Sequence, residues 1–155
     1  MVKEYTQFIF RQSERSMKMQ ASPEIRDIIT AWFSAVAAGE PAWVDRYLSQ
    51  QVLLVGTDPN EWLDFEQASM LLKGEAQEMG AMQLKVSMGR AEGFQEGSVG
   101  WGIVHPTITF PNGKSFSPRW SAVFHQEDGQ WKVVQIHASL GVPNEDLMKS
   151  LGMTD

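Results

Sequence analysis

Two turn signals near the C-terminal end, Asn112-Gly113 and Asp128-Gly129, constrain the fold of this chain more than any other feature. Both dipeptides favour tight β-hairpins, because Asn, Asp and Gly tolerate positive φ angles. They separate apolar and aromatic segments that are long enough to form strands. We therefore predict a bent antiparallel meander of four strands, at residues 82–93, 98–110, 114–126 and 130–140.

The first half of the chain is typical of helices. Ser22-Pro23-Glu24 has a hydroxyl N-cap, a Pro at the first helical position and an acid in the first turn, and apolar residues then recur at helical spacing until Gly39. Helices gathered before a long antiparallel sheet predict an α+β fold, with the helices packed on the concave face of a strongly curved sheet. The other predicted elements are a short helix after Pro41, a strand at 51–56, a loop at 57–62, and helices at 64–79 and 144–151.

The length and charge of the chain exclude several classes of protein. A chain of 155 residues fits one domain, and we assign residues 1–21 to an N-terminal extension and residues 22–155 to that domain. A net charge of −6 argues against nucleic acid or an anionic membrane as a partner, because both bind cationic surfaces. The absence of Cys excludes disulfides and thiolate chemistry, and no apolar run approaches the roughly 20 residues that span a bilayer. We expect a cytoplasmic protein.

The lengths of the two hairpin loops decide which strand residues face the interior. A two-residue Asn112-Gly113 loop pairs residue 111 with residue 114 and turns Trp101 and His105 inward, on the same face as Trp120 and Phe124. Around Asp128-Gly129 the loop can have two residues, or three if Glu127 is included. We prefer three, because that register assembles one continuous apolar face that includes Ile136, and burying each large side chain is worth about 1.5 to 3 kcal/mol.

This register leaves a mixed set of residues on the convex face of the sheet. We predict a homodimer through that face, because Trp131 and Val133 would otherwise be exposed there among polar groups such as His137. Two alternatives stay open. A bulge near Pro118 would redirect Arg119, and a two-residue second loop would return His137 to the interior.

Three segments resemble the SnoaL-like branch of the nuclear transport factor two-like superfamily. They are Trp131-Lys-Val-Val-Gln-Ile-His-Ala-Ser139, Val142-Pro143-Asn144-Glu145 and Gly56-Thr-Asp-Pro-Asn-Glu-Trp62. The resemblance implies a cone-shaped α+β domain with a pocket between the helices and the concave sheet, and commonly a dimer. It does not imply one function, because the superfamily holds ketosteroid isomerases, cyclases, dehydratases, epoxide hydrolases and non-catalytic association domains. Asp58 loosely matches the first acid of the isomerases, whereas Trp120 stands where their second acid is expected.

His105 and Asp58 are the candidate catalytic residues. An imidazole titrates near neutral pH and can act as a general acid or base among aromatic walls, although the same residue can be a core histidine bonded to a backbone carbonyl. Asp58, in the loop after the first strand, can take a proton from an activated carbon, but Asp58-Pro59 is equally a helix N-cap followed by Pro. The candidate ligand-binding residues are Trp32, Tyr47, Glu61, Trp101, Trp120, Phe124 and Ile136.

These residues predict an apolar pocket for a small polycyclic or aromatic molecule. We expect no metal site, because the three His are not at metal-ligand spacing, and no cofactor. One hypothesis is a cofactor-independent isomerase, cyclase or dehydratase that acts by general acid–base proton transfer. The other is a non-catalytic module that binds a small molecule or serves in association.

Overall fold

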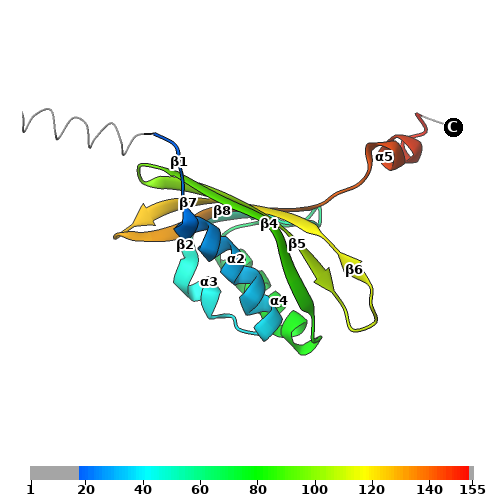
Figure 1. Cartoon of the computed structure of the whole chain (residues 1–155), viewed down its shortest axis with the longest axis horizontal. Coiled ribbons are helices and arrows are strands. Elements are labelled where there is room, and N and C mark those ends of the chain that lie inside the picture. Colours follow the sequence, from blue (N-terminus) through cyan, green and yellow to red (C-terminus); the bar gives the residue numbers. More distant parts are fainter. Residues whose placement is uncertain (1–17, 154–155) are drawn as a thin grey trace, which may run out of the picture.

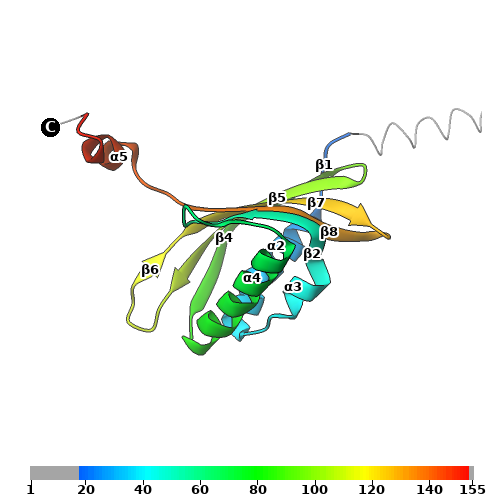
Figure 2. The ribbon, with the colours of Figure 1, turned by 180° about the vertical axis from the view of Figure 1, so that it is seen from behind.

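The computed structural model describes residues 18–153, so most of the predicted N-terminal extension lies outside the described residues. Helices α2 (Pro23–Ala38), α3 (Ala42–Tyr47) and α4 (Phe65–Ala81) lie against one side of a curved sheet (Figure 1). A further helix, α5 (Asn144–Ser150), lies apart from the sheet and the other three helices. Figure 2 shows the same arrangement from behind. The predicted α+β class, with helices on the concave face of the sheet, is confirmed. In residues 18–153, no helix is both long and apolar enough to cross a membrane.

The sheet is mostly antiparallel and does not close. Its strands follow the order β1-β4-β5-β7-β8-β2-β3, with β6 paired to β5. Within residues 18–153, the one parallel pairing joins β2 to β8. Residues 20–21, which we assigned to the extension, pair with β4 as an edge strand. The strands are β1 (Gln20–Ala21), β2 (Leu48–Val55), β3 (Trp62–Leu63), β4 (Lys85–Glu96), β5 (Val99–Thr109), β6 (Ser115–Phe116), β7 (Pro118–Glu127) and β8 (Gln130–Leu140).

Local capping explains where the two long helices begin. The hydroxyl of Ser22 accepts a hydrogen bond from the N–H of Ile25 at 3.4 Å, as the N-cap signal predicts. Asp64 caps α4 through a reciprocal capping box with Gln67. The apolar face of α2 is buried against the sheet, and Ile25 and Ile29 are completely inaccessible to solvent.

The first hairpin has a three-residue loop, so the predicted two-residue loop is wrong. Phe110 N–H donates to the carbonyl of Lys114 at 2.8 Å, and Gly113 N–H donates to the carbonyl of Phe110 at 2.9 Å. Pro111 therefore occupies the first central position of a turn, and Gly113 follows it with a φ of 82°, which suits Gly. Val104, rather than His105, lies opposite Trp120. Every residue of β5 consequently faces the side opposite to the predicted one.

Glycines make room for this register on the inner face of β5. A Cβ atom on Gly100 would lie 2.0 Å from Cδ1 of Ile25, so only Gly lets α2 approach the strand this closely. Gly102 lies in the same row, against Ile25 and Ile29. The inner face of β5 is therefore built from small and apolar residues, with Val104 and Ile108 buried.

The second hairpin corrects another prediction, because its Asp128-Gly129 loop has two residues. Glu127 lies opposite Gln130, and both loop residues have positive φ angles, 51° and 77°. A β-bulge then shifts the register, so that Phe124 pairs with Val133 but Val123 pairs with Gln135. The loop and the bulge together place Trp131 and Val133 inside, at 5% and 0% exposure, with Ile136 inside as well.

Candidate functional site

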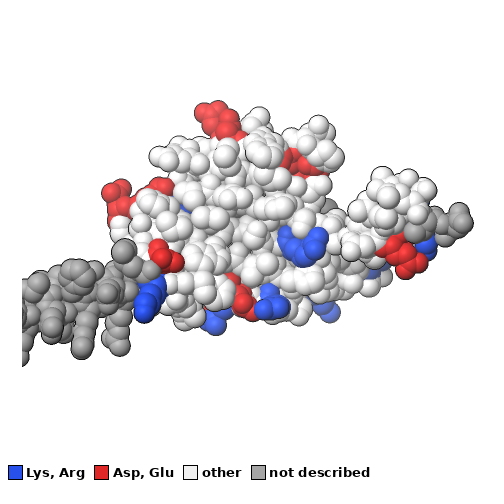
Figure 3. Space-filling model, turned by 90° about the horizontal axis from the view of Figure 1, so that it is seen from above, with Lys and Arg blue, Asp and Glu red and all other residues white. Residues whose placement is uncertain are grey.

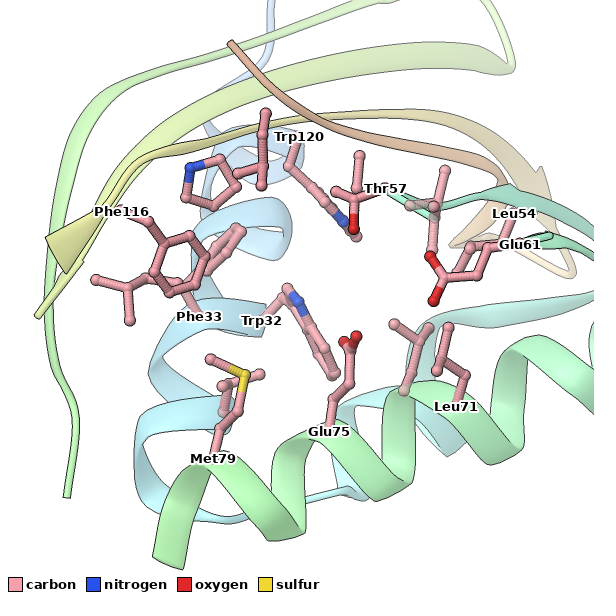
Figure 4. A pocket seen from close by; sticks show the side chains of 18 residues that line it. Trp32, Phe33, Leu54, Thr57, Glu61, Leu71, Glu75, Met79, Phe116 and Trp120 are labelled. Carbon is pink, nitrogen blue, oxygen red and sulfur yellow. The ribbon is translucent and has the colours of Figure 1, made fainter. Parts of the chain in front are cut away.

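A pocket of about 160 Å³ lies between α2, α4 and the inner face of the sheet (Figure 4). Its walls are mainly apolar, and the exposed Thr57 and Leu140 mark its rim. Polar side chains enter it from α4 and from the loop after β2. The lining residues are Trp32, Phe33, Val36, Leu54, Gly56, Thr57, Glu61, Leu71, Leu72, Glu75, Met79, Ile108, Phe116, Pro118, Trp120, Ile136, Ala138 and Leu140.

Glu75 brings an acid into the pocket from the apolar face of α4. It lies one helical turn after Leu71 and one turn before Met79, and both of these residues also line the pocket. Burial raises the pKa of the Glu75 carboxyl from 4.5 to about 7, and the negative charges of Glu61 and Glu78 add to the effect. This carboxyl can therefore take up or release a proton near neutral pH.

Glu61 brings a second carboxyl from the loop between β2 and β3. Its Oε2 accepts a hydrogen bond from the N–H of Asp58 at 3.1 Å, and its backbone carbonyl accepts one from Gly56 at 2.9 Å. A Cβ atom on Gly56 would lie 1.8 Å from the same Oε2, so this position needs Gly for the Glu61 side chain to fold over the backbone. The carboxyl groups of Glu61 and Glu75 point toward the same space (Figure 4).

Two tryptophans form part of the apolar wall and supply hydrogen-bond donors. Trp32 and Trp120 are 3% and 5% exposed, and both line the pocket. Phe33 packs edge-on against Trp120, with ring centroids 5.9 Å apart. The indole N–H of Trp43 donates to the carbonyl of Ile28 at 2.9 Å, but within residues 18–153 the indole N–H groups of Trp32 and Trp120 have no acceptor. Both can therefore donate to a ligand in the pocket.

Comparison with known families matches residues 25–143 to the SnoaL-like domain. This match covers most of the chain. The chain belongs to the SnoaL-like family. No protein with a curated description matches it in sequence.

Solved structures share the SnoaL-like fold of this chain at low sequence identity. An NTF2-like protein of unknown function from Pseudomonas putida is 14% identical, with a TM-score of 0.68 over 79% of this chain and 88% of that one. An NTF2-like protein with a cystatin-like fold from Novosphingobium aromaticivorans is 13% identical, with a TM-score of 0.63 over 96% of both chains. A protein from Parabacteroides distasonis, provisionally named a ketosteroid isomerase, is 19% identical, with a TM-score of 0.60 over 79% and 92%. At these identities the comparison supports the fold alone.

Four of the predicted ligand-binding residues line the SnoaL-like pocket, namely Trp32, Glu61, Trp120 and Ile136. Phe124 is fully buried in the core and is not part of the lining. Tyr47 lies elsewhere, in a surface depression beside Arg46, where its ring packs 5.5 Å from that of Trp43. Only part of the predicted set is therefore brought together.

Asp58 lies in the exposed turn before Glu61 and does not line the pocket. Its Oδ1 accepts hydrogen bonds from the backbone N–H of Asn60 at 2.8 Å and from Nδ2 of Asn60 at 3.1 Å. The alternative interpretation of Asp58 as a helix N-cap is wrong, because α4 begins later, at Phe65, with Asp64 as its cap. Asp58 instead positions Glu61 through its own backbone N–H.

His105 and Trp101 lie on the outer face of the sheet, opposite to the predicted side, because the first hairpin loop has three residues. His105 is exposed, and Trp101 stacks on Phe94 with ring centroids 6.0 Å apart. Trp131 and Val133, predicted for the convex face, are instead buried in the core. His137 is exposed on the outer face as predicted, and Arg119 is exposed as well.

Our sequence reasoning missed Glu75. The signal was present, because an acidic residue sits on an apolar helical stripe with Ala68, Leu72 and Met79. An acid on such a stripe is buried when the helix packs, and burial of a carboxyl shifts its titration.

Proposed function

We propose that this SnoaL-like chain is a cofactor-independent enzyme that transfers a proton on a small apolar substrate, with Glu75 as the general acid and base. The observation that carries the proposal is the position of the Glu75 carboxyl in an apolar pocket, facing the same space as Glu61. A pKa of about 7 for Glu75 supports it, because a catalytic group works best when it titrates near the working pH.

The geometry supports abstraction of a proton from carbon next to a carbonyl group. The ionised Glu75 takes the proton, and the electron pair of the C–H bond moves to the carbonyl oxygen to form an enolate. The indole N–H groups of Trp32 and Trp120 are the donors available to that oxygen. Glu75 then returns its proton to another carbon in an isomerisation, or to a leaving hydroxyl in a dehydration.

The volume of the pocket limits the size of the substrate that it can hold. A cavity of about 150 Å³ lined by apolar side chains accommodates benzene, and this pocket measures about 160 Å³. Of the predicted polycyclic and aromatic molecules, a single aromatic ring therefore fits better than a polycyclic skeleton. The Parabacteroides distasonis protein provisionally named a ketosteroid isomerase gives the fold a precedent, but its name does not fix the substrate of this chain.

The test is exchange of carbon-bound hydrogen for deuterium in heavy water, followed by proton NMR on cyclopentanone, cyclohexanone and phenylacetone. We expect the wild type to exchange α-protons at least about 100-fold faster than Glu75→Gln, since a positioned acid or base contributes about 10² to 10⁴. Glu66→Gln on the exposed side of the same helix is the control and should match the wild type. Equal exchange by the wild type and Glu75→Gln would contradict the assignment.

A non-catalytic ligand-binding module is the alternative that the same pocket supports. The favouring observation is that no His lines the pocket in the described residues, so Glu75 has no neighbouring imidazole to receive its proton. Saturable binding of these ketones with no exchange above the buffer rate would favour this role over the enzyme.

We also propose that the outer face of the sheet joins two copies of the chain. Across β2, β8, β7 and β5, two cross-strand rows on this face hold no charged side chain, and the exposed Leu53 and Ile103, at 49% and 48%, belong to them. On β4 the second row continues to Glu92, which lies opposite Ile103. Figure 3 views this side, where charged groups are scattered over a largely uncharged surface. The rows are Leu53, Gln135, Val123 and Trp101, and Val55, His137, Ser121 and Ile103.

Light scattering tests the dimer. We expect twice the chain mass of 17.4 kDa for the wild type and the single mass for Ile103→Glu. Met70→Glu, at an apolar site on α4 that is more exposed than Ile103, is the control that should remain dimeric. A wild type of 17.4 kDa at micromolar concentration would contradict the proposal.

The cytoplasmic location of the protein stays a prediction.

A further inference from the structure

The charges around the pocket are all of one sign. Its lining includes two acids, Glu61 and Glu75, and among the described residues no Lys, Arg or His contributes to it. Lys73, on the same helix as Glu75, is engaged elsewhere through an ion pair with Asp45 of α3 at 2.6 Å. An anionic ligand would therefore meet two carboxyl groups without a compensating positive charge.

A pair of carboxyl groups facing one apolar space is not stable with both groups ionised. Burial, helped by the negative charge of Glu61, raises the pKa of Glu75 so that the pair can hold a proton, and in its place the pair can hold a cation. The groups that bear on this equilibrium are Glu61 across the pocket and Glu78 on the same helix, and both are negative. A bound cation would replace the proton and leave Glu75 ionised.

The walls of the pocket suit an organic cation better than a metal ion. Four aromatic side chains line it, Trp32, Phe33, Phe116 and Trp120, and aromatic faces attract ammonium groups. Trp32 and Trp120 are more than nine-tenths buried, and their indole N–H groups have no acceptor in the described residues. These two N–H groups can therefore donate hydrogen bonds to an oxygen atom of the same ligand.

We propose that the pocket binds a small, single-ring compound that carries a protonated amino group, with the ammonium held by Glu61 and Glu75 and the ring held by the tryptophans. Its identification as the substrate rests on the proposed proton transfer, whereas its binding does not. The ammonium would ionise Glu75 on binding, so that the substrate itself converts this residue to the base.

Calorimetric titration with benzylamine, benzyl alcohol and benzoate tests the proposal at pH 6.5, because these probes share a ring and differ in charge. We expect benzylamine to bind at least about 10-fold more tightly than benzyl alcohol, a difference of about 1.4 kcal/mol, and benzoate to bind more weakly than either. Titrations in two buffers of different ionisation enthalpy should show a proton released when benzylamine binds. Equal affinity for benzylamine and benzyl alcohol would overturn the inference.

Two variants assign the effect to the pocket. Glu61→Gln and Glu75→Gln should each lose about 10-fold in benzylamine affinity, with little change for benzyl alcohol, while Glu66→Gln keeps the preference for the amine. Circular dichroism checks that each variant folds. If a variant does not fold, the preference of the wild type for benzylamine over benzyl alcohol still tests the proposal. Amine binding unaffected by both variants would also overturn the inference.

Exchange into phenacylamine separates the two proposals. Tight binding of amines without α-proton exchange would refute the enzyme but not the amine pocket. Exchange into neutral ketones without any preference for amines would refute the amine pocket but not the enzyme.

Discussion

The pocket and the outer face of the sheet both carry titratable side chains, but their surroundings differ. Glu75 is enclosed by α2, α4 and the inner face, and this burial shifts its titration to about pH 7. His105 and His137 stand exposed on the outer face, where His105 lies opposite Arg90 of β4 and His137 lies opposite Ser121 of β7. An acid held away from water in a pocket is thus a better candidate for chemistry here than an imidazole exposed on the outer face.

The largest expected contrast between the two faces uses two isoleucines on β5. Ile108→Ala removes a side chain that is 2% exposed, and we expect the free energy of unfolding to fall by about 2 to 5 kcal/mol. Ile103→Ala makes the same change at a site that is 48% exposed and should cost under about 1 kcal/mol in the monomer. Urea denaturation at low protein concentration measures both. A larger loss at Ile103 would invalidate the register of β5.

The titration of Glu75 makes a second contrast through the pH dependence of stability. Because its pKa is raised from 4.5 to about 7 in the folded chain, its contribution to stability is full below pH 4.5 and is lost as the pH rises through 7. Glu75→Gln avoids this loss and should raise the free energy of unfolding by about 1 to 3 kcal/mol at pH 8, with a smaller change at pH 5. Urea denaturation at both pH values measures the difference.

Glu66→Gln, at an exposed position of the same helix, is the matched control and should follow the wild type at both pH values. If Glu75→Gln is as stable as the wild type at pH 8, the pKa of Glu75 is not raised, and the contrast with the outer face disappears.

A third contrast compares two glycines near the pocket. Gly56→Ala forces the Glu61 carboxyl away, since the new Cβ would lie 1.8 Å from Oε2, and we expect about a 10-fold loss of α-proton exchange, or about 1.4 kcal/mol. Gly74→Ala on α4 meets nothing within 4 Å and should leave exchange unchanged while stabilising the helix slightly. Exchange rates by proton NMR distinguish the two, and equal rates would mean that Glu61 plays no part.

The smallest effect is expected on the outer face itself. His105→Gln should change the exchange rate less than about 2-fold, because this side chain cannot reach a substrate in the pocket. The same NMR assay measures it. A loss comparable to that of Glu75→Gln would restore His105 as the catalytic residue and refute the assignment to Glu75.

The helices and the strand positions could be predicted from the sequence because their signals are local. The Ser22 cap and the apolar spacing of α2 are examples, and strand β8 begins at Gln130 and ends at Leu140 as predicted. The side of the sheet that each strand residue faces could not be predicted as reliably. Side chains alternate with a period of two, so one extra loop residue at Pro111 reversed the whole of β5.

The pocket was only partly predictable for the same reason. Trp32 and Ile136 follow from helical spacing and from the apolar pattern of β8, and both line the pocket. Gly100 on the inner face gave no apolar signal, because its role is to let α2 approach the sheet. Glu75 was hidden among core residues, since its importance arises from packing against segments distant in sequence.

The most direct test of the Glu75 assignment is a carbon-13 NMR titration of the glutamate side-chain carboxyls, with Glu75→Gln used to assign the resonance. We predict that the Glu75 carboxyl titrates with a pKa of about 7 and that benzylamine lowers this value. Titration of Glu75 near 4.5, the ordinary value for this side chain, would contradict the account.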